Sequence, residues 1–141
     1  MKKIGLILVT LVLALATVSA DDRIVSAESL PQKAKDFIAA NFAGKTVQYV
    51  EKEFNEYEVQ LNDRTEIKFK GNGEWETIKS YEGVPVAALP ASLTSHVTGN
   101  FADAKIIEVE KELNRIEIKL STGMEVFFDK DGKFLGQKFD D

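Results

Sequence analysis

The sequence predicts an α+β protein made of two similar halves, each with one helix followed by a four-strand antiparallel meander. The first observation is an internal repeat: a shift of 59 positions aligns residues 30–79 with residues 89–138 without a gap, and 16 of these 50 positions are identical. The second is that each half begins with apolar residues at helical spacing and continues with apolar residues at alternating positions. A single helix covers the apolar face of four strands only in part. We therefore expect the halves to join into one sheet, with both helices on one face.

Each half is expected to open with a helix, at residues 30–42 in the first half and from Leu89 onwards in the second. Both begin with Leu-Pro, and proline is favoured in the first turn of a helix because its missing N–H costs nothing there. The spacing of apolar residues predicts which side chains face inward. They are Ala34, Phe37, Ile38 and Phe42 in the first half, and Leu93, Val97 and Phe101 in the second.

The stretch VEKEFN at residues 50–55 returns as VEKELN at residues 109–114, and it is expected to form the first strand and turn of each half. A two-residue turn at Asn55 and Glu56 would place Phe54 opposite Tyr57, because asparagine tolerates the backbone conformation that such a turn needs. In this register Val50, Phe54, Val109 and Leu113 point inward.

The last hairpin of each half allows two registers. A two-residue turn would pair Phe69 with Glu76, whereas a three-residue loop with Gly73 in the left-handed conformation pairs Phe69 with Trp75. The second register, which also pairs Phe128 with Phe134 around Gly132, keeps the apolar residues on one face. We therefore predict the three-residue loop.

The N-terminus has the pattern of a cleavable export signal at residues 1–20. Lys2 and Lys3 precede an apolar run that is shorter than the ~20 residues of a membrane-spanning helix, and Ala20 ends a group of small residues that suits cleavage. The chain has no cysteine, so it has neither a lipoprotein anchor nor a disulfide framework. We expect a periplasmic or secreted protein with no stable membrane anchor after signal removal.

The rest of the chain divides into four segments that follow the repeat. Residues 21–29 are expected to form a flexible lead-in or a short first strand, and residues 82–88 a linker with Gly83 and Pro85 as breakers. The two repeats occupy residues 30–81 and 89–141 and are expected to form one compact domain.

The charge balance argues against nucleic acid and anionic lipid as partners. The chain has 18 Lys and Arg and 23 Asp and Glu, and loss of Lys2 and Lys3 with the signal changes the net charge from −5 to −7. Phosphate-rich partners require basic patches.

These residues together resemble a known family. A leader peptide is followed twice by a helix opened by Leu-Pro, an acidic and basic strand, and a hairpin with glycine before an aromatic residue, and Gly-Val-Pro joins the copies. This arrangement resembles the exported PepSY-like proteins, often labelled "putative β-lactamase-inhibitor-like", over residues 30–138. The resemblance implies a tandem αβ repeat and a periplasmic or secreted binding module. It implies no catalytic residues.

Motifs for catalysis are missing from the sequence. It contains no cysteine nucleophile, no Gly-x-Ser-x-Gly and no His-Glu-x-x-His, and the single histidine, His96, is expected at the edge of a helix packing face. We therefore expect no enzyme, no cofactor and no dedicated metal site. Asp129 to Gly132 begin like a calcium loop, but the later ligands do not follow, so a hairpin turn is expected and calcium binding by this turn stays open. The Glu-Lys-Glu runs at 51–53 and 110–112 are expected to be solvated, with cross-strand charge pairing.

The expected partner site lies where the two copies differ on the face away from the helices. Lys68 becomes Phe127 and Glu76 becomes Leu135, which the predicted register places opposite each other as an exposed apolar pair. Exposed apolar residues rimmed by charge are typical of a partner surface, although they also occur singly without a partner. The predicted contact residues are Tyr49, Ile78, Phe127 and Leu135.

Two classes of function remain. The first is a non-enzymatic binding module that docks on another envelope or extracellular protein and inhibits or regulates a hydrolase. The alternative is a carrier of a small ligand or metal ion that uses the exposed sheet face.

Overall fold

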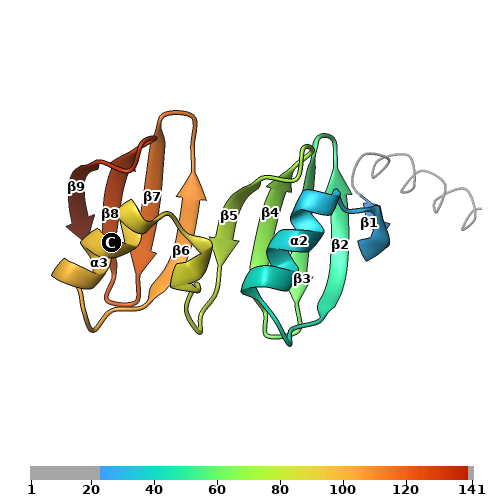
Figure 1. Ribbon diagram of the computed structural model, residues 1–141, viewed down its shortest axis with the longest axis horizontal. Coiled ribbons are helices and arrows are strands. Elements are labelled where there is room, and N and C mark those ends of the chain that lie inside the picture. Colours follow the sequence, from blue (N-terminus) through green and yellow to red (C-terminus); the bar gives the residue numbers. More distant parts are fainter. Residues whose placement is uncertain (1–22, 140–141) are drawn as a thin grey trace, which may run out of the picture.

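The computed structural model describes residues 23–139, so the predicted export signal lies outside the described residues. Residues 23–139 form two α-helices and one antiparallel sheet of nine strands, in which every strand pairs with the next in sequence (Figure 1). The predicted α+β class is confirmed. The helices are α2 (Gln32–Asn41) and α3 (Ala91–Asn100), with short 3-10 helices η1 (Ala27–Ser29) and η2 (Val86–Ala88). The strands are β1 (Arg23–Val25), β2 (Val47–Glu53), β3 (Glu56–Leu61), β4 (Glu66–Lys70), β5 (Trp75–Lys79), β6 (Ile106–Lys111), β7 (Arg115–Leu120), β8 (Met124–Asp129) and β9 (Phe134–Phe139).

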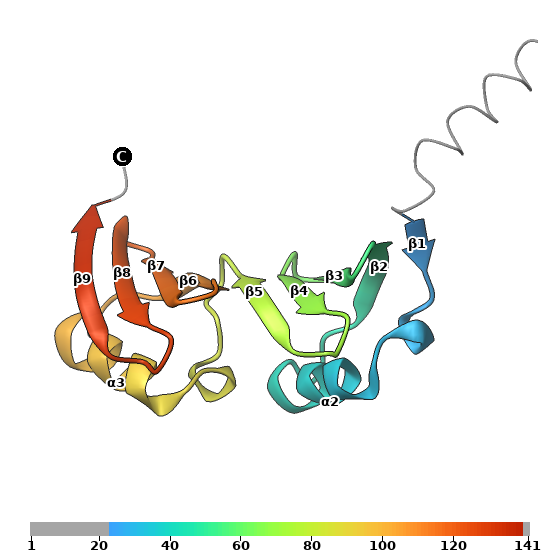
Figure 2. The ribbon, with the colours of Figure 1, turned by 90° about the horizontal axis from the view of Figure 1, so that it is seen from above.

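Both helices lie on the same face of the sheet, and no described element covers the other face, which we call the open face (Figure 2). Each helix follows a proline, Pro31 or Pro90, as the sequence predicts. The helices and strands bury one continuous apolar core. Its helix residues are Ala34, Ile38, Leu93 and Val97, and its largest fully buried sheet residues are Phe69 and Phe128.

The three-residue loops of the last hairpins are confirmed. Phe69 lies opposite Trp75 and Phe128 lies opposite Phe134. Gly73 and Gly132 adopt positive φ angles of 92° and 89°, in the left-handed region that glycine tolerates best. Both loops therefore form as glycine-dependent bulged turns.

A further bulge in β5 makes the predicted orientation of Ile78 wrong. Lys68 lies opposite Thr77 while Phe69 lies opposite Trp75, so Glu76 is an extra residue in β5. Residues three apart in a regular strand face opposite ways, but the extra residue turns Trp75 and Ile78 to the same side. Ile78 is 0% exposed and belongs to the core. It is unavailable to a partner.

The predicted first turn is also wrong by one residue. Glu53 lies opposite Glu56 and Lys52 lies opposite Tyr57, so Phe54 and Asn55 are the two turn residues. The N–H of Gly71 donates to the carbonyl oxygen of Asn55 at 2.9 Å, which holds the turn against the neighbouring β4–β5 loop.

The equivalent turn of the second half consists of Leu113 and Asn114, because the N–H of Glu112 donates to the carbonyl of Arg115. Phe54 and Leu113 are consequently 88% and 89% exposed instead of pointing inward. Val50 and Val109 are buried, as predicted.

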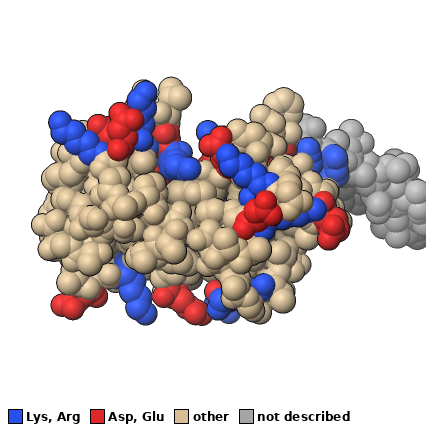
Figure 3. Space-filling view, viewed as in Figure 1, with Lys and Arg blue, Asp and Glu red and all other residues tan. Residues whose placement is uncertain are grey.

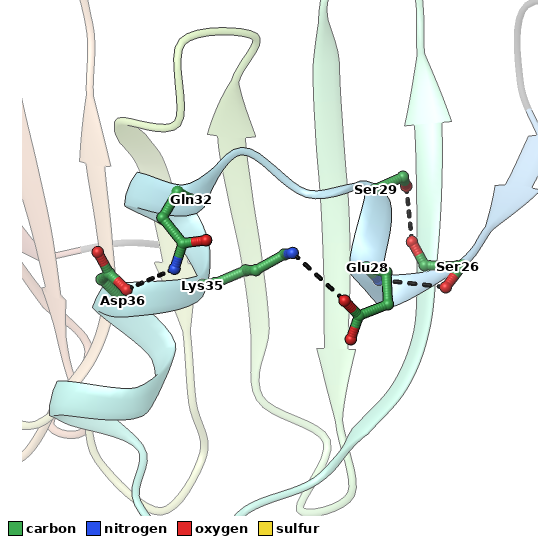
Figure 4. A network of polar contacts seen from close by, with 6 residues as sticks. All are labelled: Ser26, Glu28, Ser29, Gln32, Lys35 and Asp36. Carbon is green, nitrogen blue, oxygen red and sulfur yellow. Dashed lines mark hydrogen bonds and ion pairs between the residues drawn. The ribbon is translucent and has the colours of Figure 1, made fainter.

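The lead-in segment forms a short first strand, one of the two alternatives left open by the sequence. β1 pairs with β2, and the Ser26 side chain caps η1 by accepting a hydrogen bond from the N–H of Glu28 (Figure 4). Lys35 of α2 lies 3.6 Å from the Glu28 carboxylate, which joins this segment to the helix.

In the sheet, the two halves are joined along a short stretch of β5 and β6. Three residue pairs join these strands: Thr77 with Glu110, Ile78 with Val109, and Lys79 with Glu108. β6 and β7 share five pairs. Beyond Thr77 and Glu110 the two strands separate, and the halves diverge at the end that carries the hairpin tips (Figure 1).

The face that carries the helices has its charged side chains mainly along its upper and lower edges and around α2 (Figure 3). α3 contains no charged residue, whereas α2 contains three. No helix within residues 23–139 is long and apolar enough to cross a membrane.

Candidate functional site on the open face of the sheet

A ladder of alternating charge crosses the open face. Side chains of one sign lie opposite side chains of the other on six successive strands, an arrangement that stabilises cross-strand neighbours. Its members, from β4 to β9, are Glu66, Lys79, Glu108, Lys119, Glu125 and Lys138. None of these six residues belongs to the Glu-Lys-Glu runs at 51–53 and 110–112, for which the sequence predicted cross-strand charge pairing.

The neighbouring row contradicts that prediction. Glu51 lies opposite Glu58, and Glu110 lies opposite Glu117, so like charges face each other in both halves. In the first half Lys68 is the next residue across from Glu58, but in the second half Phe127 takes that place beside Glu117. Burial and nearby carboxylates raise the pKa of Glu58 even with Lys68 beside it. The second half therefore holds an acidic pair without the equivalent lysine.

Three carboxylates gather at this point of the second half. Ligand oxygens of Glu110, Glu112 and Glu117 lie within 4.8 Å of one another, and Arg115 approaches Glu112 at 3.6 Å and Glu117 at 3.4 Å. Burial, followed by the hydrogen bond and charge of Glu112, raises the pKa of Glu117 to about 7. The same hydrogen bond lowers the pKa of Glu112. Within residues 23–139 this cluster is the one place where three carboxylates could share a metal ion.

A hollow of about 650 Å³ opens where β5 and β6 separate. Its charged lining includes Glu56, Glu76, Glu110, Glu112, Lys68 and Lys70, and Leu113 lies at its side. A hydrogen bond to Glu76 is the main cause of the raised pKa of Glu56, which places a second carboxyl pair at the hollow. Lys111 also reaches the hollow, and its Nζ lies 3.9 Å from the centre of the Trp75 ring on β5.

The structure does not bring the four predicted contact residues together. Tyr49 is half-buried opposite Gln60 on β3, at the far side of the sheet from Phe127 on β8. Phe127 is half-buried opposite Gly136, whereas the prediction paired it with Leu135. A bulge in β9, equivalent to the one in β5, makes Leu135 the extra residue and leaves it 57% exposed.

Phe127 lies between two cations. The Arg115 guanidinium carbon is 5.4 Å and the Lys138 Nζ is 5.9 Å from the centre of its ring. Cations near the face of an aromatic ring are attracted to it, so the ring is held in place beside the acidic cluster.

The sequence predicted structural roles for His96 and for the turn that begins at Asp129, and both lie in structural positions. His96 stacks on Phe134 with ring centres 4.3 Å apart and contacts Phe128, at the edge of the α3 packing face. The Oδ1 atom of Asp129 accepts hydrogen bonds from the N–H groups of Asp131 and Lys133, each at 2.9 Å, and so closes the hairpin turn.

The sequence did not predict that Phe54 and Leu113 are exposed at the tips of their hairpins. It also did not predict the cluster of Glu110, Glu112 and Glu117. Phe54 and Leu113 align in the repeat directly before Asn55 and Asn114, and an asparagine after them is compatible with a turn that starts one residue earlier. The pair of Glu110 and Glu117 could also have been predicted, because a two-residue turn at Leu113 and Asn114 places these residues opposite each other.

Comparison with known proteins identifies the family. The model of the family described as "Putative beta-lactamase-inhibitor-like, PepSY-like" matches residues 17–70 and again residues 55–136. The chain therefore belongs to the PepSY-like family, as the sequence motifs indicated. No functionally curated protein matches this chain.

Solved structures described as those of "putative" periplasmic proteins have the same fold. One, described as a "putative calcium-regulated periplasmic protein" from Bacteroides thetaiotaomicron, is 30% identical, with a TM-score of 0.80 over 85% of this chain and 98% of the other. Another, from Bacteroides vulgatus, is 30% identical, with a TM-score of 0.77 over 84% of this chain and 97% of the other. A third, from the same species and described as of unknown function, is 28% identical, with a TM-score of 0.77 over 83% and 98%. None of these descriptions names an enzyme activity.

Proposed function

We propose that the protein is a non-enzymatic binding module of the periplasm or extracellular space, which docks on another envelope protein through the open face of its sheet. The observation that carries this proposal is that both helices lie on one side, so the other side of a nine-stranded sheet stays available (Figure 2). Phe127 and the exposed Leu135 supply apolar surface there, with charged residues around them. Such a composition suits a protein interface with an apolar centre and a polar rim.

The kind of partner follows from the family and the charge. The family description is inhibitor-like, which supports a hydrolase of the envelope as the partner and regulation of that hydrolase as the outcome. The acidic balance of the chain does not suit nucleic acid or anionic lipid.

Replacing Phe127 and Leu135 together with serine should weaken docking on the partner at least tenfold, because both changes remove apolar contact area. Neither residue is fully buried, so the thermal unfolding midpoint should fall by less than about 5 °C. The measurement is capture of the partner from an envelope extract on the immobilised protein, with far-UV circular dichroism as the check on folding.

A matched control replaces Val86 of η2 with serine. Val86 is 61% exposed on the side of the helices, so its loss should leave capture unchanged. Equal capture by wild type and the Phe127→Ser, Leu135→Ser variant would count against docking through this part of the sheet.

A second candidate function, binding of calcium, rests on the cluster of Glu110, Glu112 and Glu117. Three carboxylates within 4.8 Å of one another offer the oxygen ligands that calcium prefers, and one structural relative is described as calcium-regulated. A bound ion would also relieve the repulsion between Glu110 and Glu117.

If calcium binds there, 1 mM calcium should raise the thermal unfolding midpoint by about 5 °C, because a ligand bound to the folded state alone stabilises it. Glu117→Gln should remove this rise. Glu125→Gln, on the same face but opposite Lys119, is the matched control and should keep it. An equal rise in all three proteins, or none in the wild type, would contradict calcium binding at the cluster.

A further inference from the structure

The hairpin tips of the two halves share a feature that folding does not require. Phe54 and Leu113 occupy equivalent first positions in their turns and are 88% and 89% exposed. Turns ordinarily use Gly, Asn, Asp, Ser or Pro, and an exposed Phe or Leu adds nothing to the core. Thirty-four of the 50 aligned positions differ between the halves, yet both tips keep a large apolar residue.

Both tips stand at the same end of the sheet, one in each half, and β5 and β6 separate between them (Figure 1). The hollow described above opens where these strands separate. Leu113 lines that hollow directly, and Glu56, two residues after Phe54, lines it from the other half. In the space-filling view the outline is notched at this end, with charged atoms on both sides (Figure 3). Leu113 therefore borders the recess, whereas Phe54 stands beyond the β4–β5 loop, on the other side of β4 and β5 from it.

The charge inside the recess indicates the chemistry of its occupant. Five glutamates and three lysines line it. The Lys111 ammonium lies over the Trp75 ring, so this cation already has an attractive partner. Glu56 and Glu76 both line the recess, and the carboxylate oxygens of Glu110, Glu112 and Glu117 lie within 4.8 Å of one another at or beside it, so these neighbouring carboxylates repel one another when they are ionised. An approaching cation relieves this repulsion, so charge complementarity favours a basic ligand.

The spacing of the tips indicates the length of the ligand. The two turns are four strands apart in the sheet, and β5 and β6 separate between them, so the turns are at least about 19 Å apart at the usual spacing of about 4.8 Å between paired strands. An extended chain needs at least about six residue steps of about 3.3 Å to cover this distance.

We propose that this recess binds an extended basic segment of a partner protein, with Phe54 and Leu113 contacting one apolar residue at each end of the segment. The segment has two apolar residues at least about six positions apart and lysine or arginine between them. This inference rests on the proposed docking function and names the chemistry that the partner presents to one end of the open face. Calcium at the neighbouring acidic cluster is the competing occupant.

The probe is a seven-residue peptide with blocked termini, with leucine at both ends, lysine at positions two, four and six, and serine at positions three and five. Its affinity for the mature protein is measured by fluorescence anisotropy in low salt without calcium. We expect saturable binding, at least tenfold weaker for a peptide with glutamate in place of lysine. We also expect at least tenfold weaker binding to the Phe54→Ser, Leu113→Ser variant. Both changes are at exposed turn residues and should leave the circular dichroism melt unchanged.

Two matched variants sharpen the result. Tyr81→Ser removes an apolar side chain that is 83% exposed but lies outside the recess, and it should change peptide affinity by less than twofold. Glu56→Gln combined with Glu76→Gln should weaken binding of the lysine peptide at least threefold, because the cationic ligand loses two carboxylates.

Equal affinity for the lysine and glutamate peptides, or for wild type and the Phe54→Ser, Leu113→Ser variant, overturns the proposal. So does a protein that binds calcium at the acidic cluster but shows no saturable peptide binding. Failure of the docking function is distinguishable, because it appears as partner capture that is insensitive to the Phe127→Ser, Leu135→Ser variant. If partner capture depends on Phe127 and Leu135 but the peptide affinity is unchanged in the Phe54→Ser, Leu113→Ser variant, the recess proposal alone is wrong.

Discussion

Replacing Ile78 with serine is expected to lower the free energy of unfolding by about 3–5 kcal/mol. The change removes buried apolar atoms, leaves a cavity and places a hydroxyl in the core. Ile78 has no exposed surface and lies between Ile67 on β4 and Val109 on β6, in the strand that joins the two halves. Chemical denaturation followed by circular dichroism measures the change.

Two controls test whether the loss of stability arises because the β5 bulge turns residue 78 into the core. Thr77→Ser changes the adjacent residue, which faces the hollow, and should alter stability by less than about 0.5 kcal/mol. Gln137→Ser changes the exposed residue at the equivalent position of the second half and should be similarly neutral. A loss below about 1 kcal/mol for Ile78→Ser would mean that residue 78 faces outward and that the bulge is absent.

Replacing Glu117 with glutamine is expected to stabilise the protein at pH 8 and to have little effect at pH 4. The pKa of Glu117 is about 7 in the folded protein and 4.5 in its ordinary state. Between these values the folded state binds more protons than the unfolded state, so stability falls as the pH rises. Glutamine carries no charge and should remove this fall.

The expected gain at pH 8 is about 1–2 kcal/mol. The full shift corresponds to about 3.5 kcal/mol at about 1.4 kcal/mol per pH unit, but the opposite shift of Glu112 and the loss of the contact with Arg115 offset part of it. Denaturation at several pH values in the presence of a chelator measures the difference, with Glu125→Gln as the control. A gain that is equal at pH 4 and pH 8 would contradict repulsion among the three carboxylates as its cause.

The repeat and the periodicity predicted most of the fold. Helix bounds followed from Leu-Pro and apolar spacing, and the pairing of Phe69 with Trp75 followed from keeping aromatic residues on one face. These features depend on local sequence and on burial, which the residue pattern records directly. The family assignment is confirmed for the same reason, since its motifs are those of the fold.

The errors arise from bulges and turns that shift a strand by one residue. Without an extra residue at Glu76, alternation places Ile78 on the open face; with it, Ile78 joins the core. At the first turn, Val50 stays buried in either register, so the apolar pattern cannot choose between them. The hydrogen bond from Gly71 to Asn55 is specific to the folded structure and is not visible in the sequence.

For the candidate site, too, the sequence predicted some features, whereas others depend on the register of the strands. The sequence located the open face and the substitution of Phe127 for Lys68, but it could not show that Leu135 occupies a bulge or that Phe127 stands beside three carboxylates. Contacts between residues on different strands depend on the register of every hairpin between them. A single shifted turn changes which charges face each other.

Photo-crosslinking in the cells that make the protein tests docking through the open face most directly. A photoreactive residue is placed in turn at Phe127 and Lys68 on the open face, and at Ser95 on α3 on the opposite side. The account predicts a covalent adduct with the same discrete envelope protein from positions 127 and 68, and none from position 95. An adduct from position 95 without one from either open-face position would contradict it.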